Sequence, residues 1–295
     1  MQQINRNSPV IIGGIGGSGT RIVAEILIHI GIHLGHTLNA SLDNLWFTAL
    51  FKRLDLFKKE HGERKAEIKK GLDIFTEAMV GGSVLSDDFR RRLSDYVRDI
   101  EKDAYFNNEF EYLYHNWENF IENIMSSNRP DMDDFAGWGW KEPNTHVILE
   151  DLSNYYCDLR YIHVIRHGLD MAFSKNQNQV KFWRAMYGII PSGKNHDPVA
   201  SFRYWLKANQ NAIDTGKKML RDRFLLINYE SLCNSPEKEI KRLAKFVQLS
   251  LSNETFDIVT KIPSLPSSIG RHKKHDTSWM TDDGMRTLYK FGYGR

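Results

Sequence analysis

A glycine-rich loop near the N-terminus is the first part of this 295-residue sequence whose residue types can do chemistry. Five glycines lie between Gly13 and Gly19, and Ser18, Thr20 and Arg21 add two hydroxyls and a guanidinium. Glycines leave backbone N–H groups accessible and tolerate positive φ angles. A helix that begins directly after the loop adds a partial positive charge. The loop is therefore predicted to bind an anion, because a purely structural turn needs only one or two glycines.

Two known phosphate-binding patterns fit this loop incompletely. Gly14, Gly16 and Gly19 satisfy the dinucleotide pattern GxGxxG, but the acidic residue expected about 20 positions later is missing from the end of a strand. The nucleoside-triphosphate pattern GxxxxGK[ST] matches the spacing of Gly14 and Gly19, yet Thr20-Arg21 stands where lysine and a hydroxyl belong. Without that lysine, magnesium-assisted triphosphate chemistry loses support.

The segment Gly17-Ser18-Gly19-Thr20-Arg21 resembles a third kind of loop, the 5′-phosphosulfate loop of the sulfotransferases that depend on 3′-phosphoadenosine-5′-phosphosulfate (PAPS). In that family the loop usually reads Lys/Arg-Ser-Gly-Thr-Thr/Arg. Gly17 departs from the pattern, so the positive charge normally found there must come from Arg21, Lys141 or the backbone. The resemblance implies that six residues hold the 5′-phosphosulfate: Gly16, Gly17, Ser18, Gly19, Thr20 and Arg21.

A second segment, from Arg166 to Ser174, resembles the family's 3′-phosphate segment, in which an arginine ends a strand and a serine follows eight residues later. An arginine at the carboxyl end of a strand can hold an oxyanion through paired donors. Ser174, expected in the early turns of the next helix, would add a hydroxyl donor. The alternative is an Arg166–Asp170 surface ion pair without any ligand role for Ser174.

The C-terminal segment Ser268 to Lys274 resembles the family's closing segment, where a glycine and basic residues cover the 3′-phosphate. The resemblance implies that Gly270 and Arg271 bind this phosphate, with Lys273 as the second choice. The alternative is a solvated basic run. A further family-like segment, Asn228 to Leu232, is interpreted as structural: it ends a strand and holds a neighbouring loop.

The segment Gly137 to Pro143 resembles the family's strand that ends in Lys-Asp/Glu-Pro. It implies that Lys141 points at the sulfuryl group and stabilises the negative charge that develops on its oxygens. Lys141 and Glu142 can instead form a solvated turn pair.

The catalytic base is predicted at Asp43, which follows a short apolar segment where several relatives place an acidic residue. Glu142 and His146 are the alternatives, since some relatives use a histidine near the lysine segment. Asp43 can also be the N-cap of a helix over residues 45–51, a position that aspartate often occupies.

The elements around these motifs predict an α/β fold. Short apolar runs at 9–12, 160–166 and 224–229 are typical of buried parallel strands, and helix-start signals occur at Asp197-Pro198 and Ser235-Pro236. Alternating strands and helices predict a mostly parallel sheet flanked by helices, and the resemblance implies a P-loop-containing nucleotide-binding architecture. We expect one sulfotransferase-like domain over residues 1–295, with a helical insertion at about 43–135.

Composition restricts the remaining classes. The chain is 41% apolar, which excludes disorder, and its net charge of +3 does not indicate binding of a nucleic acid polymer. Two cysteines and eleven histidines show no metal-ligand spacing, so no metal is expected. The absence of a long apolar stretch and of a signal-peptide pattern predicts a cytoplasmic protein without a membrane span.

The resemblance implies transfer of a sulfuryl group from PAPS to a hydroxyl or amine of a small-molecule or carbohydrate acceptor, with 3′,5′-diphosphoadenosine (PAP) as product. A sulfuryl group carries less charge than a phosphoryl group, so the reaction is expected to be independent of magnesium. The alternatives are an ATP-dependent phosphotransferase or NTPase with a degenerate P-loop, and a non-catalytic nucleotide-binding relative, which Gly17 makes plausible. The sequence does not predict the oligomeric state.

Overall fold

Five strands form a single sheet in a computed structural model that describes residues 7–82, 84–100, 105, 114–190 and 197–293. The strand order is β2-β3-β1-β4-β5, and the pairs β2–β3 and β4–β5 are parallel. In these pairs Ile32 lies opposite Gly137 and Ile162 opposite Leu225. The strands are β1 (Val10–Gly14), β2 (Ile32–His33), β3 (Gly137–Lys141), β4 (Arg160–Ile165) and β5 (Phe224–Asn228). The predicted α/β class with a parallel, helix-flanked sheet is confirmed; β2 was not predicted.

The chain folds as two compact units, which are described separately. The first contains residues 1–11, 31–142 and 150–159, and the second contains residues 12–30, 143–149 and 160–295. The expected insertion at about 43–135 belongs to the first unit. Residues 83, 101–104 and 106–113 of that insertion lie outside the described residues, and the expectation of one domain with an insertion stays a prediction.

The first unit is mostly helical and packs around the aromatic residues of β3. Trp138 and Trp140 are fully buried, and the Trp140 ring stacks on Phe47 at 5.0 Å between centroids. Phe75 and Tyr156 complete this cluster from α3 and from the residue after α7. Buried aromatic pairs of this kind stabilise a core beyond the area they bury. The helices are α2 (Leu45–Phe51), α3 (His61–Val80), α4 (Asp87–Arg98), α6 (Trp117–Met125) and most of α7 (Leu149–Tyr155).

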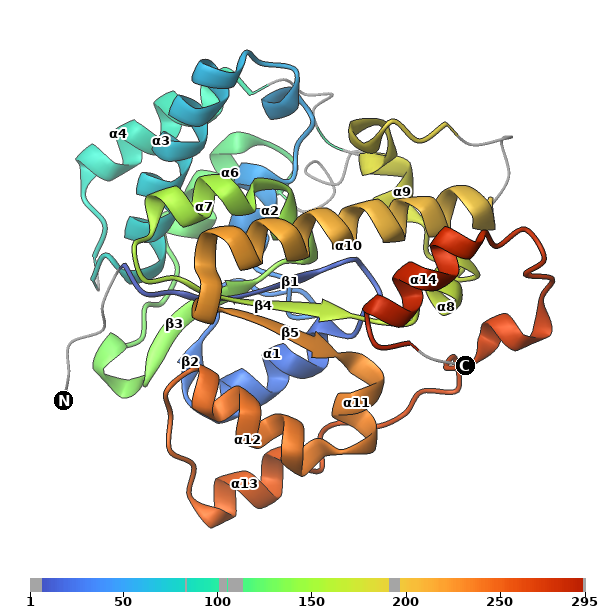
Figure 1. The fold of residues 1–295 in the computed structure, drawn as a ribbon. Coiled ribbons are helices and arrows are strands. Elements are labelled where there is room, and N and C mark those ends of the chain that lie inside the picture. The colour runs from blue at the N-terminus through green and yellow to red at the C-terminus, as the bar shows by residue number, and fades with distance from the viewer. Residues whose placement is uncertain (1–6, 83, 101–104, 106–113, 191–196, 294–295) are drawn as a thin grey trace. The chain divides into compact units, whose positions relative to one another are not determined.

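In the second unit, helices cover both faces of the β4–β5 pair. Figure 1 shows α10 along one face and α1 and α12 on the other. Glycines allow α10 to approach closely: a Cβ at Gly168 would lie 2.6 Å from the Trp205 ring, and one at Gly216 would lie 2.0 Å from Phe224. The helices are α1 (Thr20–His29), α8 (Gly168–Ala172), α9 (Asn178–Trp183), α10 (Pro198–Leu220), α11 (Tyr229–Asn234), α12 (Pro236–Phe246), α13 (Asn253–Val259) and α14 (Asp282–Lys290).

Two of these helices, α10 and α12, begin at the sequence signals that predicted them. Asp197 caps α10, since its Oδ1 accepts a hydrogen bond from the Ala200 amide at 3.0 Å, and Pro198 is the first helical residue. Ser235 precedes Pro236 at the start of α12 but makes no side-chain capping bond. Short 3₁₀ helices complete the described chain: η1 (Asp55–Phe57), η4 (Met132–Asp134), η5 (Pro143–Ile148), η6 (Arg184–Tyr187), η7 (Arg221–Arg223) and η8 (Arg271–Lys274).

Candidate nucleotide site and candidate catalytic pair

The glycine loop connects β1 to α1 and takes a backbone path that few other residues can follow. Gly17 and Gly19 have φ angles of 89° and 95°, in the left-handed region that glycine enters without steric cost. The loop turns back on itself through a hydrogen bond from the Ser18 amide to the Ile15 carbonyl, at 2.9 Å. Ser18 and Thr20 are almost completely buried, whereas Arg21 is exposed on the first turn of α1. Among the described residues the Ser18 Oγ has no hydrogen-bond partner.

A side chain that the sequence did not single out supports the loop. The Gly16 amide donates to Gln179 Oε1 at 2.5 Å, and Gln179 Nε2 donates to Asn144 Oδ1 at 2.7 Å. Trp183 Nε1 donates to the same amide oxygen of Asn144. Sequence reasoning missed Gln179 because a lone glutamine in a polar helix carries no motif.

Arg166 lies one residue beyond β4 and faces the glycine loop. It is 7% exposed, and its guanidinium donates to the Gly17 carbonyl at 3.4 Å and to Ser268 Oγ at 2.8 Å. The guanidinium also lies 5.3 Å from the centre of the Tyr229 ring, a cation–π geometry. Its Nε is buried and has no partner among the described residues. The alternative, an Arg166–Asp170 surface ion pair, is not among the interactions of the described residues, where Asp170 bonds to a different segment.

That segment is the C-terminal one. Asp170 is 1% exposed; its Oδ2 accepts from the Gly270 amide at 2.7 Å, and its Oδ1 accepts from the amide and from Nδ1 of His272, at 3.1 and 2.7 Å. Burial opposes the charged carboxylate, but the bonds from His272 and Gly270 outweigh it and keep the pKa of Asp170 below its ordinary value. Gly270 and Arg271 are therefore connected to α8, as a common site requires.

Arg166 and Arg271 are close enough to repel each other. The pKa of Arg271 is lowered, first by burial and then by the charge of Arg166. Arg271 Nε donates to the Ser268 carbonyl at 3.1 Å, so Ser268 bonds to both arginines. Two cations near each other repel, and an anion between them removes this cost.

Ser174 is located differently from the expectation. Helix α8 ends at Ala172, so Ser174 follows the helix and is not in its early turns. Its Oγ accepts a hydrogen bond from the Asn176 amide at 3.3 Å, and no contact between Ser174 and Arg166 is among those described. Phe173 is the C-cap residue of this short helix.

The interpretation of the segment after β5 as structural is confirmed. Tyr229 packs its ring against the glycine loop at Gly19, and Glu230 Oε1 accepts a hydrogen bond from the His167 amide at 3.0 Å. Both residues thus hold neighbouring loops of the second unit.

In the first unit, Lys141 and Asp43 form a salt bridge at the end of β3. The Lys141 side chain is 3% exposed and the Asp43 side chain 20%, and Lys141 Nζ also donates to the Ser41 carbonyl at 2.9 Å. Asn39 holds the second carboxylate oxygen of Asp43 at 2.9 Å. Lys141 is therefore a buried, hydrogen-bonded cation, and the alternative of a solvated turn pair with Glu142 is wrong, since both residues are 2% exposed.

The structure also bears on the alternative roles of two residues, Asp43 as a helix N-cap and His146 as the catalytic base. Asn44, not Asp43, is the N-cap of α2: its side chain accepts from the Phe47 amide at 2.9 Å. In the second unit, His146 is 2% exposed, its Nδ1 bonds to the Pro143 carbonyl, and burial lowers its pKa to about 4. This environment disfavours His146 as the base, and the choice between it and Asp43 stays a prediction.

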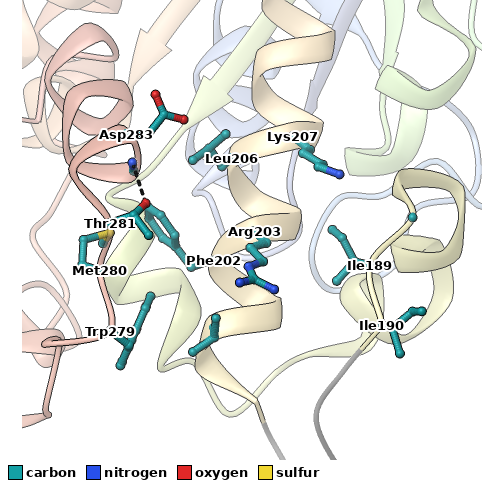
Figure 2. A pocket seen from close by; sticks show the side chains of 13 residues that line it. Ile189, Ile190, Phe202, Arg203, Leu206, Lys207, Trp279, Met280, Thr281 and Asp283 are labelled. Atoms are coloured by element: carbon teal, nitrogen blue, oxygen red, sulfur yellow. Dashed lines mark hydrogen bonds between the residues drawn. The ribbon is translucent and has the colours of Figure 1, made fainter.

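The second unit also contains a cavity of about 370 Å³ between α10 and the start of α14 (Figure 2). Phe202 and Trp279 form apolar parts of its wall, and Arg203 and Lys207 add two cations. The Thr281 hydroxyl at its edge accepts the Gly284 amide and caps α14. None of the residues predicted to bind the nucleotide lines this cavity.

Comparison with known proteins assigns the class. A family model described as the sulfotransferase family matches residues 9–253, which is most of the chain. The chain therefore belongs to the sulfotransferase family, as its motifs predicted. By this membership the protein is an enzyme that transfers a sulfuryl group, and PAPS is the donor that the family uses. No curated protein matches the sequence closely enough to be counted as a relative.

Several solved structures are similar to this chain. The sulfotransferase domain of an olefin synthase from Synechococcus PCC 7002 is 13% identical, with a TM-score of 0.50 over 100% of this chain and 98% of that one. Sulfotransferase STF9 from Mycobacterium avium is 14% identical, with a TM-score of 0.47 over 98% and 76% of the two chains. Mouse sulfotransferase SULT7A1, solved with PAP, is 12% identical, with a TM-score of 0.41 over 98% and 84%.

Within the described residues no helix is long and apolar enough to cross a membrane, and no cluster of three or more possible metal-ligating side chains occurs.

Proposed function

We propose that the second unit of this sulfotransferase binds PAPS at both of its anionic ends. The glycine loop, through Gly16, Gly17, Ser18, Gly19, Thr20 and Arg21, would hold the 5′-phosphosulfate. Arg166, Gly270 and Arg271 would hold the 3′-phosphate, and Ser174 is retained as a weaker candidate because it lies beyond α8.

The convergence of Arg166 and Arg271 on Ser268 carries this proposal: Arg166 donates to its Oγ at 2.8 Å and Arg271 to its carbonyl at 3.1 Å. Burial, and then the charge of Arg166, lowers the pKa of Arg271, and a phosphate beside the two cations would relieve their repulsion. Among the residues proposed to hold PAPS, Arg166 Nε and Ser18 Oγ are buried polar atoms without a hydrogen-bond partner in the described structure. One is on the 3′-phosphate arginine and the other is in the glycine loop, so donors remain for both anionic ends. The residues present therefore fit the cofactor.

For catalysis we propose Lys141 and Asp43. When bound, PAPS supplies the sulfuryl group that moves to the acceptor. Lys141 is fixed by Ser41 and Asp43, so it offers a preorganised cation to the negative charge that develops in the transition state. The Asp43 carboxylate is partly exposed, so it can take the proton of the acceptor, which is the task of a general base. Backbone donors and fixed cations would then suffice without a metal ion.

The acceptor that this proposal implies is a hydroxyl or an amine of a small molecule or a carbohydrate. We further propose that the protein is cytoplasmic and that residues 43–135 are an insertion in a single domain. The cytoplasmic location is supported by the low cysteine content, two residues in the whole chain.

Calorimetric titration of the full chain with PAP, 5′-AMP and ATP plus magnesium tests the nucleotide assignment. We expect PAP to bind at least about tenfold more tightly than 5′-AMP, because the 3′-phosphate adds charge-assisted hydrogen bonds. Magnesium should not be required. Binding of ATP with magnesium but not of PAP would overturn the proposal in favour of a phosphotransferase. Turnover of PAPS with a panel of phenols, sugars and amines would then separate an enzyme from a non-catalytic relative.

A further inference from the structure

Asp170 is a buried carboxylate that neither the motifs nor the proposed catalytic steps use. It lies in α8, four residues after Arg166, and is 1% exposed. A buried charge is costly unless hydrogen bonds compensate it. Here three donors do so, and all three belong to Gly270 and His272.

These bonds fix the backbone on either side of Arg271. The Gly270 amide binds one carboxylate oxygen and the His272 amide binds the other, so the residue between them is held from both directions. Gly270 has a φ of 74°, which turns the chain into η8. Arg271 itself makes one described hydrogen bond, from Nε to the Ser268 carbonyl.

The His272 ring strengthens the same attachment. Its Nδ1 bonds to Asp170, and the ring stacks on His167 with centroids 4.4 Å apart and planes 4° from parallel. His167 directly follows Arg166, so the segment carrying Arg271 is joined to both the strand end and the helix after it. Burial, and then the neighbouring His272, lowers the pKa of His167 to about 4, which keeps that ring neutral at neutral pH.

We propose that Asp170 is a positioning residue for recognition of the 3′-phosphate, holding Gly270 and His272 so that Arg271 stays beside Ser268, the residue to which Arg166 also bonds. This inference rests on the proposed function, since it deepens the 3′-phosphate assignment. Asp170 acts through the backbone of the C-terminal segment and does not touch the nucleotide.

The sign of a charge-removing substitution distinguishes positioning from simple electrostatics. If Asp170 only added negative charge near the site, Asp170→Asn would strengthen PAP binding, because an anion is no longer repelled. If Asp170 positions Arg271, the same variant weakens PAP binding. An amide offers one oxygen and one NH₂ group, so one of the two backbone N–H groups would face another donor.

The experiment compares PAP with 5′-AMP, which lacks the 3′-phosphate, on the full chain by calorimetry. For Asp170→Asn we expect about a tenfold or greater loss of PAP affinity, the size typical of a lost hydrogen bond to a charged group, and no more than about a twofold change for 5′-AMP. Asp257→Asn, on the exposed side of α13, is the matched control with the same change of charge. It should leave both affinities unchanged.

Equal losses for PAP and 5′-AMP, unchanged PAP affinity or tighter PAP binding would each overturn the inference. A wild-type chain that does not prefer PAP over 5′-AMP would instead overturn the proposed function, and the inference with it. If Asp170→Asn does not fold, His272→Ala tests the inference instead. This variant removes one of the three donors to Asp170 and should weaken the binding of PAP but not that of 5′-AMP. His272→Asn, whose amide can donate to Asp170, should recover part of that loss, and no recovery would contradict the positioning role.

Discussion

The ring of Tyr229 occupies the space that a side chain at Gly19 would need. A Cβ built at Gly19 would lie 2.0 Å from Tyr229 Cδ2, and the φ of Gly19 is 95°. Helix α1 begins at the next residue, so the glycine loop, the start of α1 and the Tyr229 ring pack closely against one another. Only a residue without a side chain can hold the loop in this path.

Gly19→Ala should therefore displace the loop. We expect a loss of about 1–3 kcal/mol in the free energy of unfolding from overpacking, together with at least a tenfold loss of PAP affinity. Gly82→Ala is the control, since Gly82 has a similar φ of 102° but nothing within 4 Å of the added Cβ. If both variants lose PAP affinity equally, the contact with Tyr229 is not the cause.

Arg166→Lys should separate charge from geometry. A lysine keeps the positive charge but loses the fork of donors that reaches Gly17 and Ser268. We expect PAP affinity to fall about tenfold or more while 5′-AMP affinity changes little, measured by calorimetry. Arg203→Lys, on the exposed side of α10, should change neither. A loss that is the same for both nucleotides would place Arg166 outside the 3′-phosphate site.

The Lys141–Asp43 pair should control turnover more than cofactor affinity. Asp43→Asn removes the proposed base, so we expect kcat to fall by about 10²–10⁴-fold, with PAP affinity within about threefold of wild type. Lys141→Met should lower kcat by about 10²-fold or more. Because the two groups act as a unit, the double variant should cost much less than the product of the two single losses. Near-normal turnover of Asp43→Asn would remove Asp43 from the role of base.

Because Lys141 is buried, we expect Asp43→Asn to lower the stability of the protein as well as its activity, so both have to be measured. Its Nζ is buried, so Asp43→Asn leaves an ammonium without its counter-charge, held only by neutral oxygens, and loss of one partner of a buried pair typically costs about 3–5 kcal/mol. Chemical unfolding of each variant at the assay temperature shows whether the enzyme assayed is folded.

Acid should destabilise the second unit through His163. This fully buried ring bonds to Asn209 Oδ1 at 2.9 Å, and burial lowers its pKa to about 3 from the ordinary 6.5. Below pH 6.5 the unfolded chain binds a proton that the folded chain does not, so stability falls as the pH decreases toward 3, by up to about 1.4 kcal/mol per pH unit.

The measurement is the urea midpoint between pH 7 and pH 4.5. His163→Asn should reduce the decline, to which His146 and His167 also contribute through their lowered pKa values. His29→Asn, on the exposed side of α1, should leave it unchanged. A wild-type midpoint that does not fall over this range would contradict the buried, neutral state of His163.

Much of the proposed nucleotide site could be predicted from the sequence because its signals are local. A strand that ends in glycines and continues into a helix places backbone amides at one point, and an arginine after a β-branched run places a guanidinium at the end of a strand. The structure has β1, α1, β4 and Arg166 in these positions. Family membership confirms the class that these motifs indicated.

Residues that act through packing were harder to predict. Gln179 supports Gly16 from 163 positions away, and Ser268 bonds to Arg166 from 102 positions away, so neither is marked by any nearby pattern. Asp43 and Asn44 are adjacent and are both good helix caps, and only the turn geometry makes Asn44 the cap of α2.

The sequence by itself determined the class of this protein, its parallel sheet and the anionic character of its ligand, since backbone conformation and charge at strand ends depend on neighbouring residues. Only the tertiary structure decided that His146 is enclosed, that Ser174 lies beyond its helix and that Asp170 holds the segment of Arg271. Burial and long-range hydrogen bonds depend on which distant segments fill the same space, and that is settled by packing of the whole core.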